Sequence, residues 1–420
     1  MEDNARQCLP NVVIWGAGKK CKIVVSAIYK DKCTLKGIAD SNMQLHQSKY
    51  MNQWIIDAPE KLIDESIDYI IVSPEFSETI LEQCREMGIE KSKVIVYWES
   101  DIEYDFIDSN VKKIYELENE LKKIKIRINN LPYELGLKPE PMIRSAEELL
   151  ETIIKEKKSL SRYGDGELEI MQNRVRPWFQ ETDKKLAERL KEIFNCKDQR
   201  IIIALANDFG NLDCFTEESA DAIRQYLSEG IREKVMQMID LNRTYYDAYV
   251  SRPYIQYQDK HYADRIFTLF KKIWENRDVL LVEGRYAYNG IRNDLFQEAA
   301  SIRRIIAPAK NAFSMYDEIL TAAEKCAEKD TLVLISLGPT ATVLAYDLAM
   351  KGIQALDIGQ LDNEYEWYMR GTDKKTKIPG KCVAESVGYR IPDEIEDRLY
   401  EQQIIARIEG KDTAPPEKID

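Results

Sequence analysis

The stretch Ser159–Glu169 reads SLSRYGDGELE. Residues 159–163 have strand character, a Gly-Asp-Gly-Glu turn follows them, and an amphipathic segment comes next. In extended backbone, residues two apart project to the same side, roughly 6–7 Å apart at Cα. Asp165 and Glu167 are therefore expected to converge on one divalent cation, because such ions prefer oxygen ligands.

The residues around this pair suit a ligand beside the cation. Gly164 and Gly166 leave room for a bulky group, and Arg162, on alternate spacing, could steady an anion. A solvated Asp-Gly turn explains the same residues equally simply. The motif therefore needs support from the rest of the chain.

Composition limits the class of protein. The 420 residues are enough for two domains, and a hydrophobic content of 44% supports real cores. No apolar run approaches the roughly 20 residues that span a bilayer. The amino-terminal sequence MEDNARQCLPN is acidic and polar, unlike a secretory signal, so a cytoplasmic location is expected.

Charge and cysteine usage exclude several functions. Eight scattered cysteines indicate reduced thiols rather than a zinc site or a disulfide framework. With only His46 and His261 in the chain, a histidine-based triad is disfavoured and any metal must be bound mainly by oxygen. The net charge of −13 disfavours a nucleic-acid partner.

The first 107 residues predict a small, single-wound Rossmann-like domain. Residues 11–28 indicate a strand, a glycine turn and a helix, and Gly16 and Gly18 match the first two glycines of a dinucleotide-binding turn. Cys21 stands at the third glycine position, a departure from that fingerprint. Asp40 follows a second strand and could hold a ribose hydroxyl. Close strand–helix packing explains the glycines without a nucleotide, and we favour that interpretation.

A helical connector is expected over residues 108–135. Apolar residues recur there at intervals of three and four, between lysines and glutamates: Ile114, Leu117, Leu121, Ile124 and Ile128. This is a coiled-coil-like seam of about two and a half heptads. It could join two copies in a homodimer through residues 111–128, or lie against one domain of its own chain.

Residues 136–400 predict a larger α/β domain with a mainly parallel sheet, followed by a polar tail over 401–420. The expected helices are 145–157, 182–195, 217–238, 262–274, 315–328 and 339–351. The expected strands are 200–206, 278–283, 303–307, 331–337 and 354–358. Because ligands of such sheets bind beyond the carboxyl ends of the strands, the residues there are the candidates for a site.

Two of these strand ends suit phosphate or sugar. Glu283, Gly284 and Arg285 end one strand, and Arg292-Asn293-Asp294 follows before an expected apolar helix, which Asp294 could simply cap. Gly338 and Pro339 end another strand, where Thr340 falls in the first helical turn. The free N–H groups there make a seat for a diphosphate, although a plain strand–helix turn has the same sequence.

Two further segments complete the set. Asp357, Asp362, Glu364 and Glu366 fall within ten residues, so one of them could be a general base, or they could form a solvated helical face. Tyr365 and Trp367 could stack on sugar rings. Asn311 could hydrogen-bond a base or ribose, and Arg252, among several tyrosines, could line the same cleft.

Ordered motifs in residues 140–385 carry a family resemblance. They read SRYGDGE, YVSRPY, VEGR with IRNDLF, APAKNAFSMYDEIL, LISLGPTATVLAYDLA and ALDIGQLDNEYEW. Together they resemble the GT-D type glycosyltransferases, while the first domain resembles the short Rossmann-like domains appended to bacterial sugar-modifying enzymes. Gln360 departs from the family pattern, in which a histidine is expected.

The resemblance implies transfer of a sugar from a UDP-sugar to a glycan or glycoprotein, with inversion. It implies Mn²⁺ or Mg²⁺ at Asp165 and Glu167, and Glu364 or Asp362 as base. Arg285 would help to stabilise the leaving diphosphate. The substrate-binding residues expected are Arg162, Gly164, Arg252, Gly284, Arg292, Asn293, Asp294, Asn311, Gly338, Thr340, Asp357 and Gln360.

Two other functions compete with this one. One is an NAD(P)-dependent nucleotide-sugar oxidoreductase or epimerase that uses the Gly16-Ala17-Gly18 turn, but no convincing Tyr-x-x-x-Lys pair accompanies that turn. The other is a non-catalytic scaffold that dimerises through the connector. The carboxylates, arginines and glycines at several strand ends argue against a scaffold.

Overall fold

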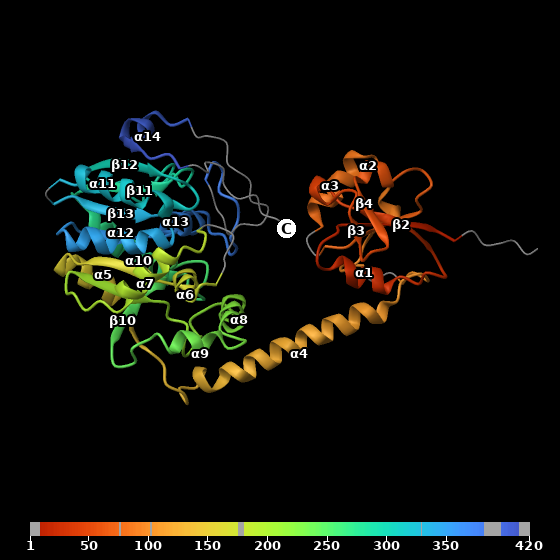
Figure 1. Cartoon of the computed structure of the whole chain (residues 1–420), viewed down its shortest axis with the longest axis horizontal. Coiled ribbons are helices and arrows are strands. Elements are labelled where there is room, and N and C mark those ends of the chain that lie inside the picture. The colour runs from red at the N-terminus through yellow and green to blue at the C-terminus, as the bar shows by residue number, and fades with distance from the viewer. Residues whose placement is uncertain are drawn as a thin grey trace, which may run out of the picture. The chain divides into compact units, whose positions relative to one another are not determined.

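The chain forms two compact units in a computed structural model, whose described residues are 9–74, 77–100, 103–174, 180–328, 330–381 and 396–410 (Figure 1). The border between the units falls between Lys125 and Ile126, inside helix α4 (Ser109–Glu134). Among the described residues, no helix combines the length and the apolar character needed to span a bilayer.

The first unit is built on a six-stranded sheet of order β3-β4-β2-β1-β5-β6. Its strand pairs are parallel except for β3 with β4. The strands are β1 (Asn11–Trp15), β2 (Thr34–Ala39), β3 (Lys49–Tyr50), β4 (Trp54–Asp57), β5 (Tyr69–Val72) and β6 (Val94–Val96). Continuous apolar runs form the inner strands because side chains on both faces are buried.

Helices cover both faces of this sheet. Apolar residues of α1 (Cys21–Ala27) pack with Val12 and Ile14 on one face. Those of α2 (Pro59–Leu62) and α3 (Glu78–Glu86) pack with Val13 and Trp15 on the other. The single-wound arrangement expected from the sequence is therefore wrong, because the chain switches faces on either side of β1.

The second unit contains a nine-stranded sheet of order β15-β12-β11-β13-β14-β8-β9-β10-β7. Every neighbouring pair is parallel, which confirms the α/β fold class. The strands are β7 (Met142–Arg144), β8 (Ser159–Tyr163), β9 (Ile201–Leu205), β10 (Thr244–Asp247), β11 (Asp278–Gly284), β12 (Ser301–Ala307), β13 (Leu332–Ser336), β14 (Ala355–Asp357) and β15 (Ile404–Arg407).

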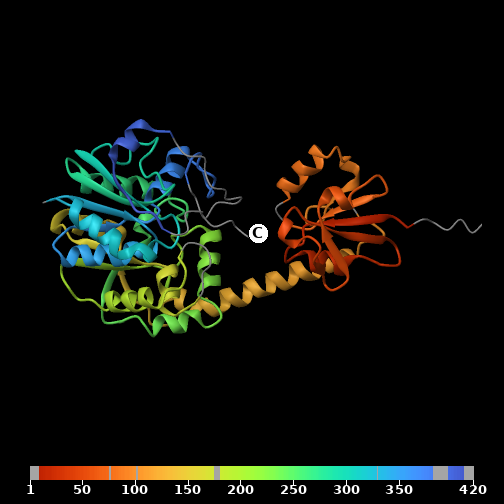
Figure 2. The same ribbon diagram turned by 45° about the horizontal axis from the view of Figure 1, so that its top comes forward.

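Helices lie on both faces of this sheet as well (Figures 1 and 2). One face packs against α5 (Ala146–Glu156), α10 (His261–Trp274) and α13 (Leu361–Arg370). The other packs against α6 (Asp165–Met171), α7 (Lys184–Phe194), α8 (Glu217–Tyr226), α9 (Ile231–Met236), α11 (Tyr316–Cys326) and α12 (Pro339–Met350). Burial of both faces explains why strands such as β9 are apolar throughout.

Three sequence predictions fail in this unit. The helix expected over 217–238 is split into α8 and α9, because after α8 ends at Tyr226 the backbone turns left-handed at Glu229 (φ +57°) and Gly230 (φ +81°), directly before α9. The apolar helix expected after Asp294 is a series of turns. Part of the predicted polar tail is ordered structure, since α14 (Arg398–Gln403) leads into β15, which pairs with β12.

Candidate functional site

The polar residues predicted from the sequence gather at the carboxyl ends of neighbouring strands. In sheet order, β13, β14, β8, β9 and β10 lie side by side. Gly338 and Thr340 follow β13, Asp357 ends β14, and Asp165 follows β8. Because all these strands are parallel, their loops meet at one edge of the sheet, where ligands of open α/β sheets bind.

The Asp-x-Glu pair lies in the first turn of α6 rather than in extended backbone. The Glu167 carboxylate accepts the Gly164 N–H at 2.9 Å and so caps the helix. Asp165 accepts the N–H of Gly166, also at 2.9 Å. Helical residues two apart point to different sides, so the extended backbone expected from the sequence at this pair is wrong.

Each carboxylate also has an acidic neighbour. Burial, and next the charge of Asp357, raise the pKa of Glu167. Burial is also the main cause that raises the pKa of Asp208, with a further contribution from Asp165. The Asp165-x-Glu167 motif therefore lies between two further carboxylates, Asp357 of β14 and Asp208 after β9.

Asp208 is the principal residue that the sequence analysis missed. It follows β9, is 3% exposed, and accepts the Tyr249 hydroxyl on Oδ2 at 3.2 Å. Its other oxygen, Oδ1, is buried and has no hydrogen-bond partner among the described residues. Burial raises its pKa to about 7. Its position three residues after an apolar strand was the available signal.

Arg162 holds two strands and a loop together. Its guanidinium donates to Asp357 Oδ1 at 2.8 Å, to the Asp357 carbonyl at 2.9 Å and to Ser251 Oγ at 2.7 Å. Gly359 makes room for it, since a Cβ at that position would lie 2.1 Å from Arg162 Nη2. The predicted role as an anion-steadying group does not fit these contacts, because the guanidinium is already engaged within the protein.

Thr340 and Asn311 contact one short segment before α7. Thr340 is fully buried and its hydroxyl donates to Gln180 Oε1 at 3.3 Å. Asn311 Oδ1 accepts the N–H of Glu181 at 2.7 Å. Gly338 is half-buried at the start of the twelve-residue helix α12, with Pro339 in the first turn as predicted. The described contacts of Thr340 and Asn311 therefore hold the loops at the end of β13.

Asp362 lies in a buried ion cluster instead of facing a substrate. Its Oδ1 accepts the Gly290 N–H and the Asn293 amide, both at 2.8 Å. Lys381 Nζ lies 2.5 Å from its Oδ2 and 3.2 Å from Glu366. A carboxylate paired in this way, at 1% exposure, is poorly placed to take a proton from an acceptor.

Glu364, the other predicted base, anchors the loop that follows β10. Its Oε2 accepts the N–H groups of Tyr254 and Ile255, both at 3.0 Å. The side chain is 1% exposed, and burial raises its pKa. Both predicted bases therefore have structural partners that sequence reasoning could not supply.

The end of β11 forms a second polar cluster. Glu283 is fully buried, where it accepts from Arg304 at 2.6 Å and from the Asn289 amide at 2.7 Å. Gly284 packs closely on the backbone of Ala309. The half-buried Arg285 lies over the ring of Tyr286.

Four other predicted residues lie around these strand ends. Asp294 is bonded to Lys271 and the Tyr365 hydroxyl, and Arg292 is exposed. Arg252 and Gln360 are half-buried after β10 and β14. Asp294 thus has a structural partner on each side, whereas Arg292 stays accessible to a ligand.

A sequence profile described as the glycosyltransferase GT-D fold matches residues 160–386, more than half of the chain. The chain belongs to the GT-D glycosyltransferase family. The residues matched include β8, α6, and the loops after β9, β13 and β14 described above.

Solved structures agree with this assignment. The second unit, from Ile126 onward, is called the GT-D unit below. The chain matches a structure of the domain of unknown function 1792, with 35% identity and a TM-score of 0.62 over 68% of this chain and all of that chain. A glycosyltransferase of the same domain type from Streptococcus sanguinis matches with 34% identity and a TM-score of 0.61, over 64% of this chain and all of that one.

Two curated relatives are also glycosyltransferases by name. A probable glycosyl transferase of Streptococcus gordonii is 35% identical over 274 residues, and the glycosyltransferase GlyD of Streptococcus pneumoniae is 36% identical over 267 residues. Both matches cover 63% of this chain. They span only 39% and 32% of the relatives' own lengths.

The first unit matches a different profile, described as C2185-like, N-terminal, over residues 9–95. Asp40, predicted to hold a ribose hydroxyl, has a partner within this unit. Its Oδ2 accepts the Ala17 N–H at 2.7 Å. None of these four relatives is named as an oxidoreductase, so the alternative function gains no support.

Proposed function

We propose that this GT-D family member transfers a sugar from a UDP-sugar to a hydroxyl of a glycan or glycoprotein, with the help of Mn²⁺ or Mg²⁺. The observation that carries the proposal is the arrangement of carboxylates at the ends of β8, β9 and β14, one of which has a buried oxygen without a partner among the described residues. Family membership supports the reaction class.

The residues present fit a hard cation. The donors around α6 are carboxylate oxygens, the ligands that Mn²⁺ and Mg²⁺ prefer. Among the described residues, no group of three or more His, Cys, Asp and Glu side chains could hold a metal alone. That suits a cation shared with the substrate, because Mg²⁺ commonly binds one or two carboxylates and the phosphates of a nucleotide.

Asp165 and Glu167 would hold the ion, and Asp208 would add its buried Oδ1 on the Asp165 side. A bound cation would act as a Lewis acid that neutralises the charge of the departing UDP. The cation would also offset the repulsion that now acts between Asp165 and Asp208. Arg162 has a different task, since its bonds to Asp357 and Ser251 hold the loops around the carboxylates.

The diphosphate would bind on the β13 and β11 side of the cation. The start of α12 offers N–H groups and the positive end of a helix dipole beside Gly338. Arg285 and Arg292 lie at the end of β11 and in the loop after it, where their charges would attract phosphate. We do not assign the acceptor's proton to Asp362 or Glu364, because both are buried and bonded within the protein.

The test is a donor screen with a binding control. Purified protein is incubated with UDP-glucose, UDP-galactose or UDP-N-acetylhexosamines in Mn²⁺, and released UDP is measured. One donor should yield UDP, and chelation should stop its release. In parallel, electron paramagnetic resonance of Mn²⁺ should show binding that weakens in Asp208→Asn. A folded protein that neither releases UDP nor binds Mn²⁺ in the presence of UDP would overturn the proposal.

A further inference from the structure

Helix α4 carries an apolar ladder that faces solvent along nearly its whole length. Six residues of the helix form the ladder, and each is between 48% and 63% exposed: Ile114, Leu117, Leu121, Ile124, Ile128 and Leu131. They recur at intervals of three and four, so they line one face of the helix. Exposed apolar surface of this length indicates an interaction site.

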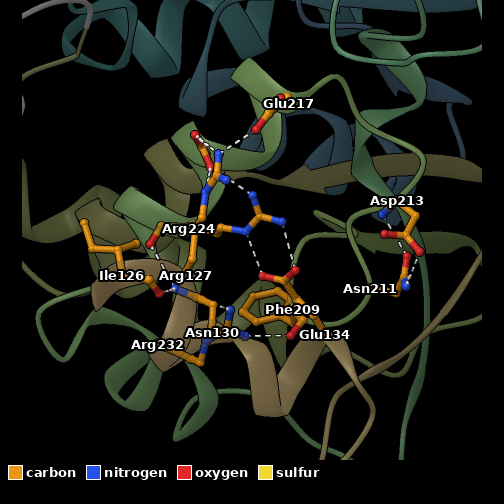
Figure 3. A network of polar contacts seen from close by, with 11 residues as sticks. Ile126, Arg127, Asn130, Glu134, Phe209, Asn211, Asp213, Glu217, Arg224 and Arg232 are labelled. Carbon is orange, nitrogen blue, oxygen red and sulfur yellow. Dashed lines mark hydrogen bonds and ion pairs between the residues drawn. The ribbon is translucent and has the colours of Figure 1, made fainter. Parts of the chain in front are cut away.

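The GT-D unit binds the carboxyl-terminal part of α4 without covering the ladder residues in that part. Arg127 donates to Asp221 at 2.7 Å and to Glu217 at 2.8 Å, and Glu134 pairs with Arg224 at 2.8 Å (Figure 3). These contacts tie the carboxyl-terminal part of α4 to α8. The ladder residues of that part, Ile128 and Leu131, nevertheless remain exposed.

Buried polar groups also fix the face of α4 that binds α8. Asn130 is 3% exposed, and its Oδ1 accepts from Arg232 of α9 at 2.7 Å (Figure 3). Arg232 also lies over the ring of Tyr133, 4.2 Å from its centroid. The helix therefore cannot roll its ladder onto the GT-D unit without breaking these buried contacts.

The first unit also binds α4 away from the ladder. The ring of Tyr115 contacts that of Trp98 at a tilt, with centroids 5.2 Å apart, and Val111 packs at the edge of the core. Between the two anchored parts, every residue from Glu116 to Lys125 is exposed. Isolated helices shorter than roughly 12–15 residues are marginal in water, so a partner along this section would stabilise it.

We propose that the occupant of the ladder is α4 of a second copy of this chain, in a parallel two-stranded coiled coil. In heptad terms, Ile114, Leu121 and Ile128 are a positions, and the remaining ladder residues are d positions. The flanking g and e positions then carry complementary charges. Lys113 would face the partner's Glu118, and Glu120 would face the partner's Lys125.

The ion pairs to the GT-D unit favour the parallel orientation. In the antiparallel pairing, Ile114 would lie opposite the partner's Leu131, and Glu120 would form its ion pair with the partner's Arg127. Arg127 is already bonded to Asp221 and Glu217. The parallel pairing uses only Lys113, Glu118, Glu120 and Lys125, all in the part of α4 that precedes the GT-D unit. Its charge pairs therefore form without competition from Asp221 and Glu217.

The first experiment measures mass. Sedimentation equilibrium of the full chain should give twice the chain mass of 48.8 kDa. Leu121→Glu with Ile124→Glu should raise the dimer dissociation constant at least ~100-fold, because four apolar side chains per dimer become charged. The matched control is Asn119→Glu with Asn129→Glu, which adds the same charge to exposed positions off the ladder and should leave the dimer intact.

The second experiment tests orientation by charge exchange. Glu120→Lys should weaken the parallel dimer, and Glu120→Lys with Lys125→Glu should restore it. In the antiparallel pairing the double variant would instead be weaker than the single one. Its introduced lysine would face the partner's Arg127, as in the single variant, and its introduced glutamate would also face the partner's Glu118. That result would overturn the parallel assignment.

A cross-link gives an independent measure of orientation. Ile114→Cys should form a disulfide to the same position of the second copy under mild oxidation. In the antiparallel pairing the two positions would be about 25 Å apart, too far for such a bond. The parent chain, with its native cysteines, is the control. A parent chain that stays monomeric, or a ladder variant that dimerises as tightly as the parent, would overturn the whole proposal.

Discussion

Arg162 and Asp357 form an ion pair, 2.8 Å between Nη2 and Oδ1, at the ends of two adjacent strands. The arginine side chain is 15% exposed and the aspartate 3%. Removing the Arg162 guanidinium would leave the buried charge of Asp357 without compensation, which typically costs about 3–5 kcal/mol. The pair therefore matters for the stability of the site's framework.

We expect Arg162→Met to lower the free energy of unfolding by about 3 kcal/mol, because methionine keeps the apolar stem but abandons Asp357. Urea denaturation measures the change. Arg162→Met with Asp357→Asn should lose less than the single variant, because no buried charge then remains. Equal losses in the two variants would show that the charge of Asp357 is not compensated by Arg162.

The metal assignment predicts a specific loss of binding. Mn²⁺ should tighten UDP binding to the parent chain, and Asp165→Asn with Glu167→Gln should abolish that effect while the fold is retained. Isothermal titration calorimetry of UDP with and without Mn²⁺ measures it. Asp317→Asn with Glu318→Gln, which makes the same change in the exposed first turn of α11, should behave as the parent. Undiminished Mn²⁺ dependence in the first variant would refute the assignment.

Glu364 allows an anchor to be distinguished from a base. Glutamine keeps an oxygen that can accept the N–H groups of Tyr254 and Ile255, so Glu364→Gln should retain kcat within about tenfold. Loss of a general base would instead cost roughly 10²–10⁴ in rate. Glu364→Ala, which leaves two buried donors without an acceptor, should destabilise the fold by about 2–4 kcal/mol. UDP release and urea denaturation separate the two effects.

Asp247 predicts a pH dependence of stability. Burial raises its pKa from 3.8 to about 7, although the Tyr249 N–H and the Tyr257 hydroxyl donate hydrogen bonds to its carboxylate. The folded state then binds a proton that the unfolded state has released, so this group lowers stability as pH rises from about 4 to about 7. Below its ordinary pKa the group has no such effect.

Asp247→Asn removes this dependence. Relative to the parent, the free energy of unfolding of the variant should rise by on the order of 2–3 kcal/mol between pH 5 and pH 8. Urea denaturation at a series of pH values measures the difference. A difference that stays constant over this range would mean that the carboxylate is solvated and titrates normally in the folded chain.

Sequence patterns predicted the parts of the fold that local chemistry decides. Runs of apolar residues such as Val12–Trp15 and Ile201–Leu205 became buried parallel strands, because both faces of each sheet are covered. The strand ends that carry Gly338 and Asp357 also meet at one edge, as expected from parallel topology. These features follow from residues close together in the chain.

The predictions that failed depend on distant partners or on a competing local motif. Nothing near Asp362 indicates that Lys381 and Asn293 will bond it, and nothing near Glu364 indicates the N–H groups of Tyr254 and Ile255. The extended backbone assumed at Asp165 was a different error, because a glutamate three residues after Gly164 is itself a helix-start signal. That signal favours a helix start over extended backbone at Asp165.

The space beside Gly359 couples the residues that can occupy two positions. The guanidinium of Arg162 fills the volume that a side chain at 359 would require, and Gly359 also takes a left-handed φ of +49°, so a methyl group there requires both a smaller residue at 162 and a strained backbone. Comparison of descendants of this chain should therefore reveal paired exchanges at 162 and 359, although the two residues are 197 positions apart.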